Sequence, residues 1–569
     1  MTTLDWVVLV GTIFAIVAYG TWKTRGPQDM AGYLKGGASL TWPTIGLSVM
    51  ATQASAITFL STPGQAYEDG MRFVQFYFGL PLAMVVISAV FIPIYYRLKV
   101  YTAYEYLERR FDAKVRYLGA LLFLIQRGLA AGITIYAPAI ILSSILGWSL
   151  NATIGGIGVV VILYTVLGGT KTVSQTQKHQ MVVMMGGMIA AAFVIGYDLS
   201  DNVSLPHAVK VAGALGRMNV VDFSFDLNNR YNFWSGITGG FFLALSYFGT
   251  DQSQVQRYLT GRSVTESRLG LLFNGVFKIP MQALILFIGV LVFVFYVFVK
   301  PPVFFNQPTL EAVRATPHAA ALAEAEARYG AAFEAQKAAA AAYVARLEAG
   351  ADDAAAKAAL AEAGKVVKQT REDARRVVQA ALPEAETKDA DYVFISFVLS
   401  YLPAGLVGLL IAVIMSAAMS STASELNALG STTYIDLYQR ALAPTHDDRR
   451  AVQASKLFTA LWGGVALAFA ATASLLDNLI EAVNILGSIF YGTVLGLFLV
   501  AFFMKRVSAT PVFLAALVAQ ATVVTLFFTS ELGFLWYNVV GCFVVMLVAG
   551  LLQAVGPWPQ PEPASAARR

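Results

Sequence analysis

Three stretches of small and hydroxyl-bearing residues interrupt otherwise apolar segments of the chain. They read MATQASAIT at 50–58, LSYFGTDQSQ at 245–254 and AAMSSTAS at 417–424. Carbonyl oxygens freed by an interrupted helix can join hydroxyl oxygens around a hard cation such as Na⁺. The alternative is structural, because small residues also allow close helix packing and hydroxyls bond to the preceding turn. The chemistry to expect here is ion and solute binding.

The elements around these stretches read as membrane helices. The chain has 569 residues, of which 57% are hydrophobic and 13% charged, whereas soluble domains carry roughly a quarter charged residues. Uncharged runs of about 20 residues recur, as a bilayer core requires. We therefore predict an all-α integral membrane protein with about 13 transmembrane helices, near 4–22, 41–64, 72–97, 115–147, 151–168, 178–197, 232–256, 267–299, 392–436, 452–474, 478–504, 510–529 and 533–554.

Basic residues collect in alternate loops, which fixes an orientation. One set of loops holds pairs such as Arg109 and Arg110, Arg449 and Arg450, and Arg568 and Arg569, while the opposite loops are short and acidic or neutral. Because cytoplasmic loops are enriched in Lys and Arg, we expect the N-terminus outside and the C-terminus in the cytoplasm. The expected location is the plasma membrane, or the inner membrane of a bacterium, with lipid around the helices.

The segment 305–390 departs from the apolar pattern. It is rich in Ala, Glu, Lys and Arg, and Gly350 followed by two aspartates marks a stop between two helical stretches. We predict an extracytoplasmic helical hairpin that is either a solvated spacer or an arm for an extracytoplasmic partner. The expected organisation is then 1–304 with helices 1–8, 305–390 as the hairpin, 391–555 with helices 9–13, and 556–569 as a cytoplasmic tail.

The interrupted segments at 50–58 and 245–254 lie at comparable places in two halves of the chain. The halves are 41–197 and a second beginning at about 231, with one extra helix before them and two after them. Paired interrupted helices at the interface of two repeats are the usual sequence signal of a transporter site at the membrane midplane.

Four short blocks, in order, resemble those of one family. They are TAYEYLERRF at 102–111, IYAPA at 135–139, GTDQ at 249–252 with VQRYL at 255–259, and the serines at 420–421 running into DLY at 436–438. Together they are similar to the solute:sodium symporter family, whose relatives carry sugars, monocarboxylates and proline. The resemblance implies a LeuT-type fold of five-plus-five inverted repeats.

The resemblance also implies a sodium site between the second and ninth spans. Its ligands would be the carbonyls of Ala51, Ala54 and Ala417 and the hydroxyls of Ser420 and Ser421.

Some members have a second sodium site, and this chain departs from its pattern. Gln177 stands where the family often has Asp, and Ala423 replaces one hydroxyl beside Ser424. An uncharged amide and a missing oxygen would weaken a cation site, so we expect one Na⁺ per cycle.

The solute pocket is chosen by polarity and by resemblance. Lys278 could bind a solute hydroxyl or carboxylate, or it could extend to the membrane interface, and Asp251 could be its ion partner. Arg127 and Gln126 are expected to anchor helix ends, and Glu425 and Asn427 to lie near the cytoplasmic exit. The predicted solute ligands are Gln53, Thr58, Gln75, Tyr247, Asp251, Lys278 and Asn484.

The expected function is Na⁺-coupled uptake of a small organic solute, either a sugar or a monocarboxylate. An amino acid such as proline, or sialic acid, is an alternative solute. A transporter-like sensor that signals through a partner is an alternative function. An enzyme is not expected, because no G-x-x-x-x-G-K-[ST] loop and no H-E-x-x-H motif occurs in the sequence. No basic stripe or motif predicts nucleic-acid binding.

Overall fold

The structure is a computed structural model that describes residues 1–23, 32–33, 39–384, 387, 389–441, 448–472 and 479–558. Within these residues all regular secondary structure is helical, and the one strand-like contact is an isolated bridge between Leu40 and Gly261. The all-α prediction is confirmed for this part of the chain. Most of the predicted tail, from 559 onward, lies outside the described residues, including Arg568 and Arg569.

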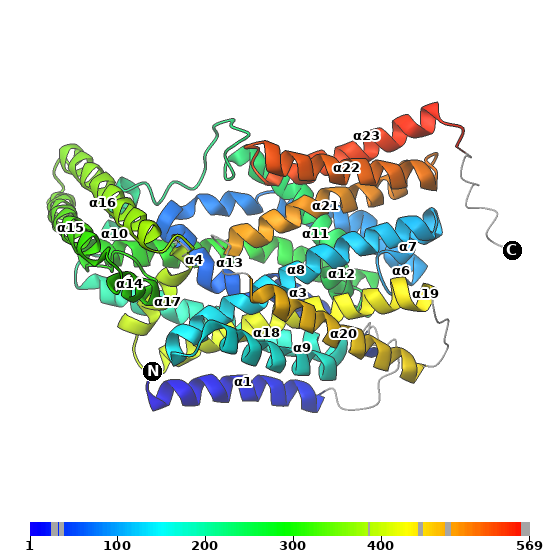
Figure 1. The fold of residues 1–569 in the computed structure, drawn as a ribbon, viewed down its shortest axis with the longest axis horizontal. Helices are drawn as coiled ribbons and strands as arrows, with labels where there is room; N and C mark the ends of the chain where they lie inside the picture. The colour runs from blue at the N-terminus through cyan, green and yellow to red at the C-terminus, as the bar shows by residue number, and fades with distance from the viewer. Residues whose placement is uncertain are drawn as a thin grey trace.

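Helices run side by side along most of the molecule, as the ribbon shows (Figure 1). The first half contains α1 (Thr3–Lys23), α3 (Trp42–Gln53), α4 (Ala56–Asp69), η2 (Gly70–Tyr77), α5 (Leu80–Val86), η3 (Ile87–Phe91), α6 (Ile92–Leu98), α7 (Glu105–Arg110), α8 (Ala113–Leu146), α9 (Leu150–Ser200) and α10 (Leu205–Ala214). The second half begins with η4 (Ser235–Gly239), α11 (Gly240–Gly249), α12 (Gln252–Tyr258) and α13 (Val264–Phe298). After the polar segment come α17 (Ala390–Tyr401), α18 (Leu406–Thr432), η5 (Thr433–Tyr438), α19 (Gln439–Ala441), α20 (Asp448–Ala470), α21 (Leu479–Phe503), α22 (Ala509–Thr529) and α23 (Leu535–Val555).

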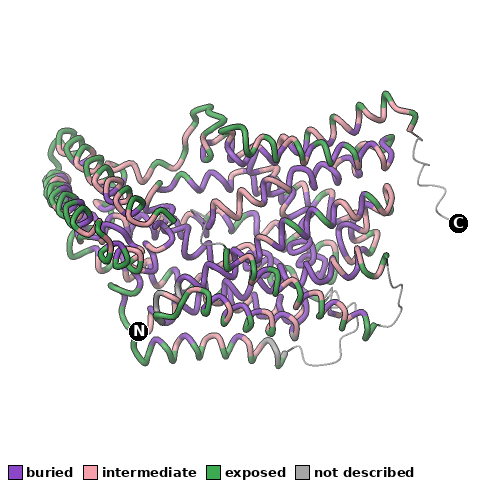
Figure 2. The backbone as a smooth tube through the Cα atoms, in the orientation of Figure 1, coloured by how far each residue is buried: buried purple, intermediate pink, exposed green. Residues whose placement is uncertain are grey.

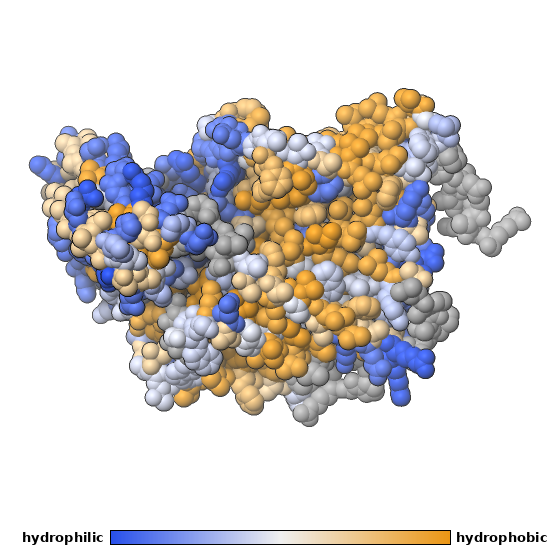
Figure 3. Space-filling view, viewed as in Figure 1, coloured by the Kyte–Doolittle hydropathy of each residue, from blue (hydrophilic) through white to orange (hydrophobic). Residues whose placement is uncertain are grey.

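The apolar surface matches a membrane-embedded body. Among the described residues, nine helices are long and apolar enough to cross a membrane. Shorter apolar helices lie at Thr3–Tyr19, Leu150–Val166 and Ala390–Tyr401. A broad hydrophobic surface covers the helices, and hydrophilic residues gather at the end that carries the hairpin (Figure 3). The total of about 13 spans and the five-plus-five repeat remain predictions.

Both predicted helix interruptions are confirmed. The second span divides into α3 and α4 around Ala54 and Ser55, and Ser55 is extended with ψ 174°. The seventh span divides into α11 and α12 around Thr250 and Asp251. The Asp251 side chain accepts from the amide of Ser253 at 2.9 Å and starts α12 as its N-cap. The chain therefore carries its own signals for stopping and restarting both helices.

The predicted ninth span, 392–436, is wrong as one helix, because the structure divides it into α17 and α18. Pro403 and Gly405, with φ 88°, lie between them. Asp5 of α1 accepts hydrogen bonds from the amides of Gly405 and Gly408 at 2.7 and 3.1 Å and so caps α18. The apolar character of 402–404 hid this break from sequence reading.

The two spans expected at 151–168 and 178–197 lie in α9, which consists of two helical arms on either side of a kink. Its backbone is kinked at Gly169, where φ is 63° and ψ is 176°. Glycine adopts this positive φ without the steric cost that a side chain would add, so this residue allows the change of direction between the two arms.

The polar segment folds as three helices at one end of the molecule. They are α14 (Gln307–Arg314), α15 (Ala319–Glu348) and α16 (Ala354–Ala381). The last two pack against each other and turn at Gly350, with φ 61°. They share a small core of their own that includes Leu322 and Tyr329. We call α15 and α16 the hairpin. Its outer surface is largely exposed, whereas buried residues gather in the middle of the body (Figure 2).

One prediction concerns the close contact between α4 and α13. A Cβ atom on Gly289 would lie 2.2 Å from the carbonyl oxygen of Pro63. We expect Gly289→Ala to lower the free energy of unfolding by about 1–3 kcal/mol, the usual cost of overpacking. The control is Gly186→Ala, because nothing lies within 4 Å of a Cβ at that position. The measurement is the melting temperature of both detergent-purified variants, and equal melting temperatures would contradict this packing.

Candidate solute and sodium site

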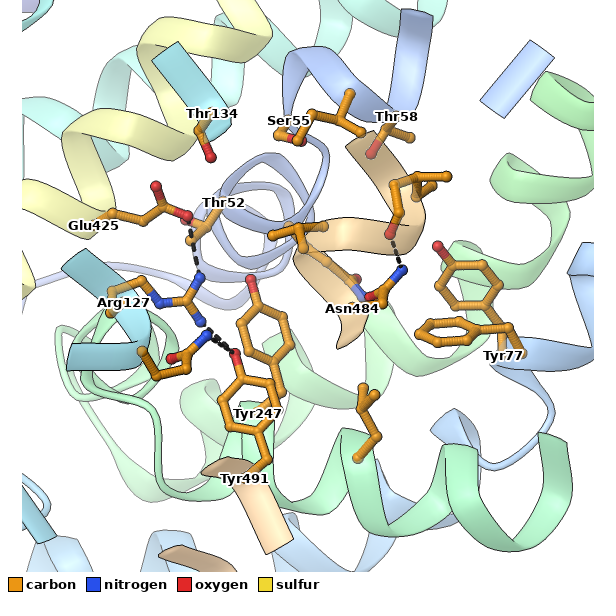
Figure 4. A pocket seen from close by; sticks show the side chains of 17 residues that line it. Thr52, Ser55, Thr58, Tyr77, Arg127, Thr134, Tyr247, Glu425, Asn484 and Tyr491 are labelled. Carbon is orange, nitrogen blue, oxygen red and sulfur yellow. Dashed lines mark hydrogen bonds and ion pairs between the residues drawn. The ribbon is translucent and has the colours of Figure 1, made fainter. Parts of the chain in front are cut away.

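The first helix interruption borders a cavity of about 90 Å³ in the middle of the helix bundle (Figure 4). Side chains of α3, α4, η2, α8, α11, α18 and α21 surround it. Four of the predicted solute ligands line this cavity, namely Gln53, Thr58, Tyr247 and Asn484. We call it the central cavity. Its other lining residues are Thr52, Ser55, Ile57, Phe76, Tyr77, Gln126, Arg127, Thr134, Leu243, Glu425, Ile480, Val483 and Tyr491.

A buried ion cluster forms one wall of the central cavity. Arg127 of α8 pairs with Asp251 at the second interruption through a short contact, and with Glu425 of α18 at 3.1 Å. Its guanidinium also donates to the Tyr491 hydroxyl and lies 5.2 Å from the centre of the Tyr247 ring. One cation thus faces two carboxylates, and one oxygen of Glu425, Oε2, has no hydrogen-bond partner among the described residues.

These contacts correct three expectations from the sequence. Asp251 pairs with Arg127 and not with Lys278. Arg127 and Gln126 lie within α8 and face the central cavity, so the expectation that they anchor helix ends is wrong. Glu425 lines the central cavity too and does not mark an exit. A charged residue inside an apolar span is by itself a functional signal, and Arg127 carried that signal in the sequence.

Asn427, which was grouped with Glu425, contacts α9, and its expected position near the cytoplasmic exit stays a prediction. Its side-chain amide donates to the Thr170 hydroxyl at 2.7 Å, just after the kink in α9. It is buried and is absent from the lining of the central cavity. Its observed hydrogen bond therefore links α18 to α9.

Gln75, predicted to bind solute, forms hydrogen bonds that link two segments of the protein. Its side-chain amide donates to the carbonyl of Tyr231 at 3.0 Å and accepts from the amide of Asp222 at 2.9 Å. These bonds hold the segment before η4 against η2. Gln75 does not line the central cavity.

Lys278 is fully buried in α13, and its side chain does not extend to the interface. Its Nζ atom has no hydrogen-bond partner among the described residues and lies 5.7 Å from the centre of the Tyr77 ring. Tyr77 lines the central cavity. Lys278 thus lies behind the wall, outside direct reach of a solute in this conformation.

The predicted sodium ligands meet where α3 packs against α18. Ser420 Oγ donates to the carbonyl of Ala51 at 2.8 Å, and Ser421 Oγ donates to the carbonyl of Ala417 at 2.9 Å. All of these residues and Ala54 are buried. The donor set holds only neutral hydroxyl and carbonyl oxygens, which suit a hard monovalent ion. Ala54 lies at the helix interruption itself, and the role of these five residues as Na⁺ ligands stays a prediction.

Gln177 and Ser424, the two residues of the predicted degenerate second sodium site, lie next to each other. The Nε2 atom of Gln177 lies 3.0 Å from Thr52 Oγ1, 3.0 Å from the carbonyl oxygen of Ser420 and 2.7 Å from Ser424 Oγ. Its Oε1 atom accepts from the Ser48 hydroxyl at 2.5 Å. The hydrogens of the Gln177 amide carry partial positive charge and point at oxygens that would otherwise be free to bind a cation.

A family model for the sodium:solute symporter family matches residues 33–323 and 373–519 of this chain. The Homo sapiens sodium/iodide cotransporter is 36% identical over 301 residues, which cover 51% of this chain and 45% of that protein. The Homo sapiens sodium-coupled monocarboxylate transporter 1 is 36% identical over 273 residues, covering 48% of this chain and 44% of that protein. The matched region thus spans less than half of these curated relatives.

One solved structure shares the fold over nearly the whole chain. It is a Na⁺-coupled sialic acid symporter in a substrate-bound, outward-open state, with a TM-score of 0.75. The superposition covers 99% of this chain and 100% of the other at 21% sequence identity. At that identity the likeness establishes the fold alone.

The contact between Ser420 and Ala51 generates a second prediction. Removing one hydroxyl ligand from the sodium site should weaken Na⁺ binding by roughly tenfold, or about 1.4 kcal/mol. We expect Ser420→Ala to require that much more Na⁺ for the same thermal stabilisation of the purified protein. The matched control is Ser431→Ala on the same helix, whose hydroxyl donates to its own turn at Ala428. If both variants need the same Na⁺ concentration for the same thermal stabilisation, Ser420 is not a Na⁺ ligand.

Proposed function

We propose that this chain, a member of the sodium:solute symporter family, carries a small organic anion into the cell together with Na⁺. The family match supports Na⁺ as the coupling ion, because it extends over most of the chain. The observation that carries the choice of solute is Arg127 in the wall of the central cavity. Two relatives are named for iodide and for monocarboxylates, which are small anions.

The size of the central cavity favours a small solute. Its volume is about 90 Å³, whereas an engineered protein cavity of about 150 Å³ takes up benzene. A short monocarboxylate is closer to this volume than a hexose is. Lys278, which was expected to bind a solute hydroxyl or carboxylate, lies outside the cavity lining. We therefore favour the monocarboxylate class over the sugar class.

The ion cluster offers a way to bind the anion. Arg127 holds Glu425 by a single contact at 3.1 Å, whereas it holds Asp251 by two hydrogen bonds. A solute carboxylate that replaces Glu425 would receive the fork of guanidinium donors that carboxylates match. Asp251 would stay in place as the N-cap of α12.

Charge balance then makes anion binding depend on Na⁺. Arg127, Asp251 and Glu425 together carry one net negative charge when ionised. A second negative charge in this buried place is costly unless a cation enters nearby. Na⁺ beside Ser420 and Ser421 would supply that cation, and each ligand would raise the affinity for the other by the same factor.

We further propose one Na⁺ per cycle, and the support is that the Gln177 amide bonds to the oxygens of Ser420 and Ser424, where the family resemblance would put a second cation. The proposed topology has about 13 spans in a five-plus-five repeat. In Figure 1, α6, α7 and α19 lie together at the end opposite the hairpin. Arg97, Arg109, Arg110 and Arg440 lie on these elements, so the positive-inside rule places that end in the cytoplasm and the hairpin outside.

The Arg127–Glu425 contact leads to a pair of variants with opposite effects. Arg127→Gln should abolish Na⁺-dependent uptake of monocarboxylates, while Na⁺ still stabilises the purified protein and so reports an intact fold. Glu425→Gln removes the competing carboxylate and one negative charge. It should bind the anion more tightly, and its binding should depend less on Na⁺. The measurements are radiolabelled uptake into liposomes and thermal shifts with and without Na⁺. Unchanged uptake in Arg127→Gln would overturn the proposal.

The proposed stoichiometry has an electrical consequence. One Na⁺ moving with one monovalent anion carries no net charge, whereas one Na⁺ with a neutral sugar would gain about 2.3 kcal/mol per 100 mV. We expect the uptake rate into proteoliposomes to be the same with and without an imposed K⁺-diffusion potential. Uptake that rises with an inside-negative potential would indicate either a neutral solute or a second Na⁺.

A further inference from the structure

A second cavity, of about 380 Å³, lies between the hairpin and the outer ends of α4, α10 and α13. We call it the hairpin cavity. The segment 324–372, which the family model leaves unmatched, supplies much of its wall, including Phe333 and Lys368. The cavity therefore depends on a part of this chain that lies outside the shared family sequence.

Basic side chains outnumber acidic ones around the hairpin cavity. Arg371 and Arg375 at its inner end are already paired, since both contact Glu68 and Asp389 at 2.7–3.1 Å. Their charge is therefore largely neutralised by carboxylates of the protein itself. In all, five basic and two acidic side chains line the cavity, namely Arg217, Lys365, Lys368, Arg371 and Arg375, and Glu68 and Glu372.

The positive charges of two other residues, Arg217 and Lys368, are less fully neutralised by nearby carboxylates. Arg217 donates to the main-chain carbonyl of Glu68 and stacks 4.5 Å from the centre of the Phe293 ring. Lys368 is exposed at the rim and forms none of the ion pairs found among the described side chains. Asp69 interacts electrostatically with both. Glu68, which is already paired with Arg371 and Arg375, also interacts electrostatically with Arg217. Among the described side chains, however, neither Arg217 nor Lys368 forms an ion pair, so both are available to an anionic group.

The base of the hairpin cavity is aromatic. Tyr67 lies edge-on to Phe293 and to Tyr296, with ring centres 5.5 and 6.1 Å apart. Phe333 of α15 adds an apolar side chain from the hairpin. Such a surface buries the apolar body of a ligand, while the cations above it attract an anionic group.

We propose that the hairpin cavity is a second binding site, for an organic anion with an aromatic or similarly bulky apolar body. Its volume is about four times that of the central cavity and falls in the range of roughly 300–1,000 Å³ typical of sites for drug-sized molecules. The ligand is therefore larger than the transported solute. Since Glu68 belongs to α4, whose other end borders the central cavity, the ligand contacts an element shared by both sites.

Benzoate is a suitable probe, and benzyl alcohol is its neutral counterpart. Binding is measured by titration calorimetry on the purified full chain carrying Arg127→Gln, which removes the anion partner of the central cavity. Two further changes are added separately to this variant. Lys368→Gln removes the rim charge, and Ala361→Phe fills the cavity from α16. The control is Lys357→Gln, on the exposed face of the same helix.

We expect saturable benzoate binding at millimolar concentrations and at least tenfold weaker binding of benzyl alcohol. Lys368→Gln should weaken benzoate by up to about fivefold, as for an exposed charge pair. Ala361→Phe should abolish binding, and Lys357→Gln should leave it unchanged. Any of three results would overturn the proposal: no binding, equal binding of the alcohol, or binding that survives Ala361→Phe. Because uptake is not the readout, failure of this site is distinguishable from failure of the proposed transport.

Discussion

A chain inside a bilayer must satisfy every backbone polar group from within the protein, and the rest of this structure depends on how it does so at two broken helices. Two carbonyls at the second break accept hydrogen bonds from tyrosines. Tyr95 donates to the carbonyl of Gly249 at 2.8 Å, and Tyr104 donates to that of Thr250 at 2.9 Å. This break is closed by side chains of the protein and has no free carbonyl to offer at these positions.

The first break is satisfied differently, and the difference suggests a division of roles. Ala51 receives a hydroxyl proton from Ser420 of α18, a bond that rotation of one hydroxyl can release. An entering cation could take over that carbonyl and the serine oxygen together, without moving either backbone. The second break instead holds Asp251 rigidly as an N-cap and ion partner. In the proposed transporter the first break would bind the ion, and the second would position Arg127 for the solute.

The sequence blocks that indicated the family have a structural role visible in these contacts. Thr102 donates to Asp436 at 2.8 Å, and Gln252 accepts from the amide of Ala103 at 3.0 Å. Arg116 joins Asp436 to Glu108, at 2.7 and 2.6 Å. The blocks at 102–111, 249–252 and 436–438 therefore meet in space and hold one another. The resemblance of these blocks to a family could be recognised from the sequence, whereas the contacts between them are seen only in the folded structure.

Local chemistry explains which features could be predicted. Small and polar residues inside apolar runs indicate helix breaks, so the breaks at 54–55 and 250–251 could be predicted. The ion pair between Arg127 and Asp251 could not be found this way, because the two residues are 124 positions apart in the chain. Whether Asp251 pairs with Arg127 or with Lys278 depends on how the helices pack. The break before α18 was missed because its cap, Asp5, comes from the first helix.

The hairpin also bears on how α4 can move. Burial alone would lower the pKa of Arg371, but the carboxylates of Asp389 and Glu68 hold it well above its ordinary value, so these pairs stay ionised. Separating the partners would leave mostly buried charges without compensation, which is unfavourable. A Cβ on Gly64 would lie 1.9 Å from the Ala390 carbonyl oxygen, so α4 and α17 are also in close contact. Motion of α4 by itself would break these contacts and its close contact with α13 at Gly289. Motion together with α13, α17 and the hairpin would keep them, which makes these elements a natural moving unit.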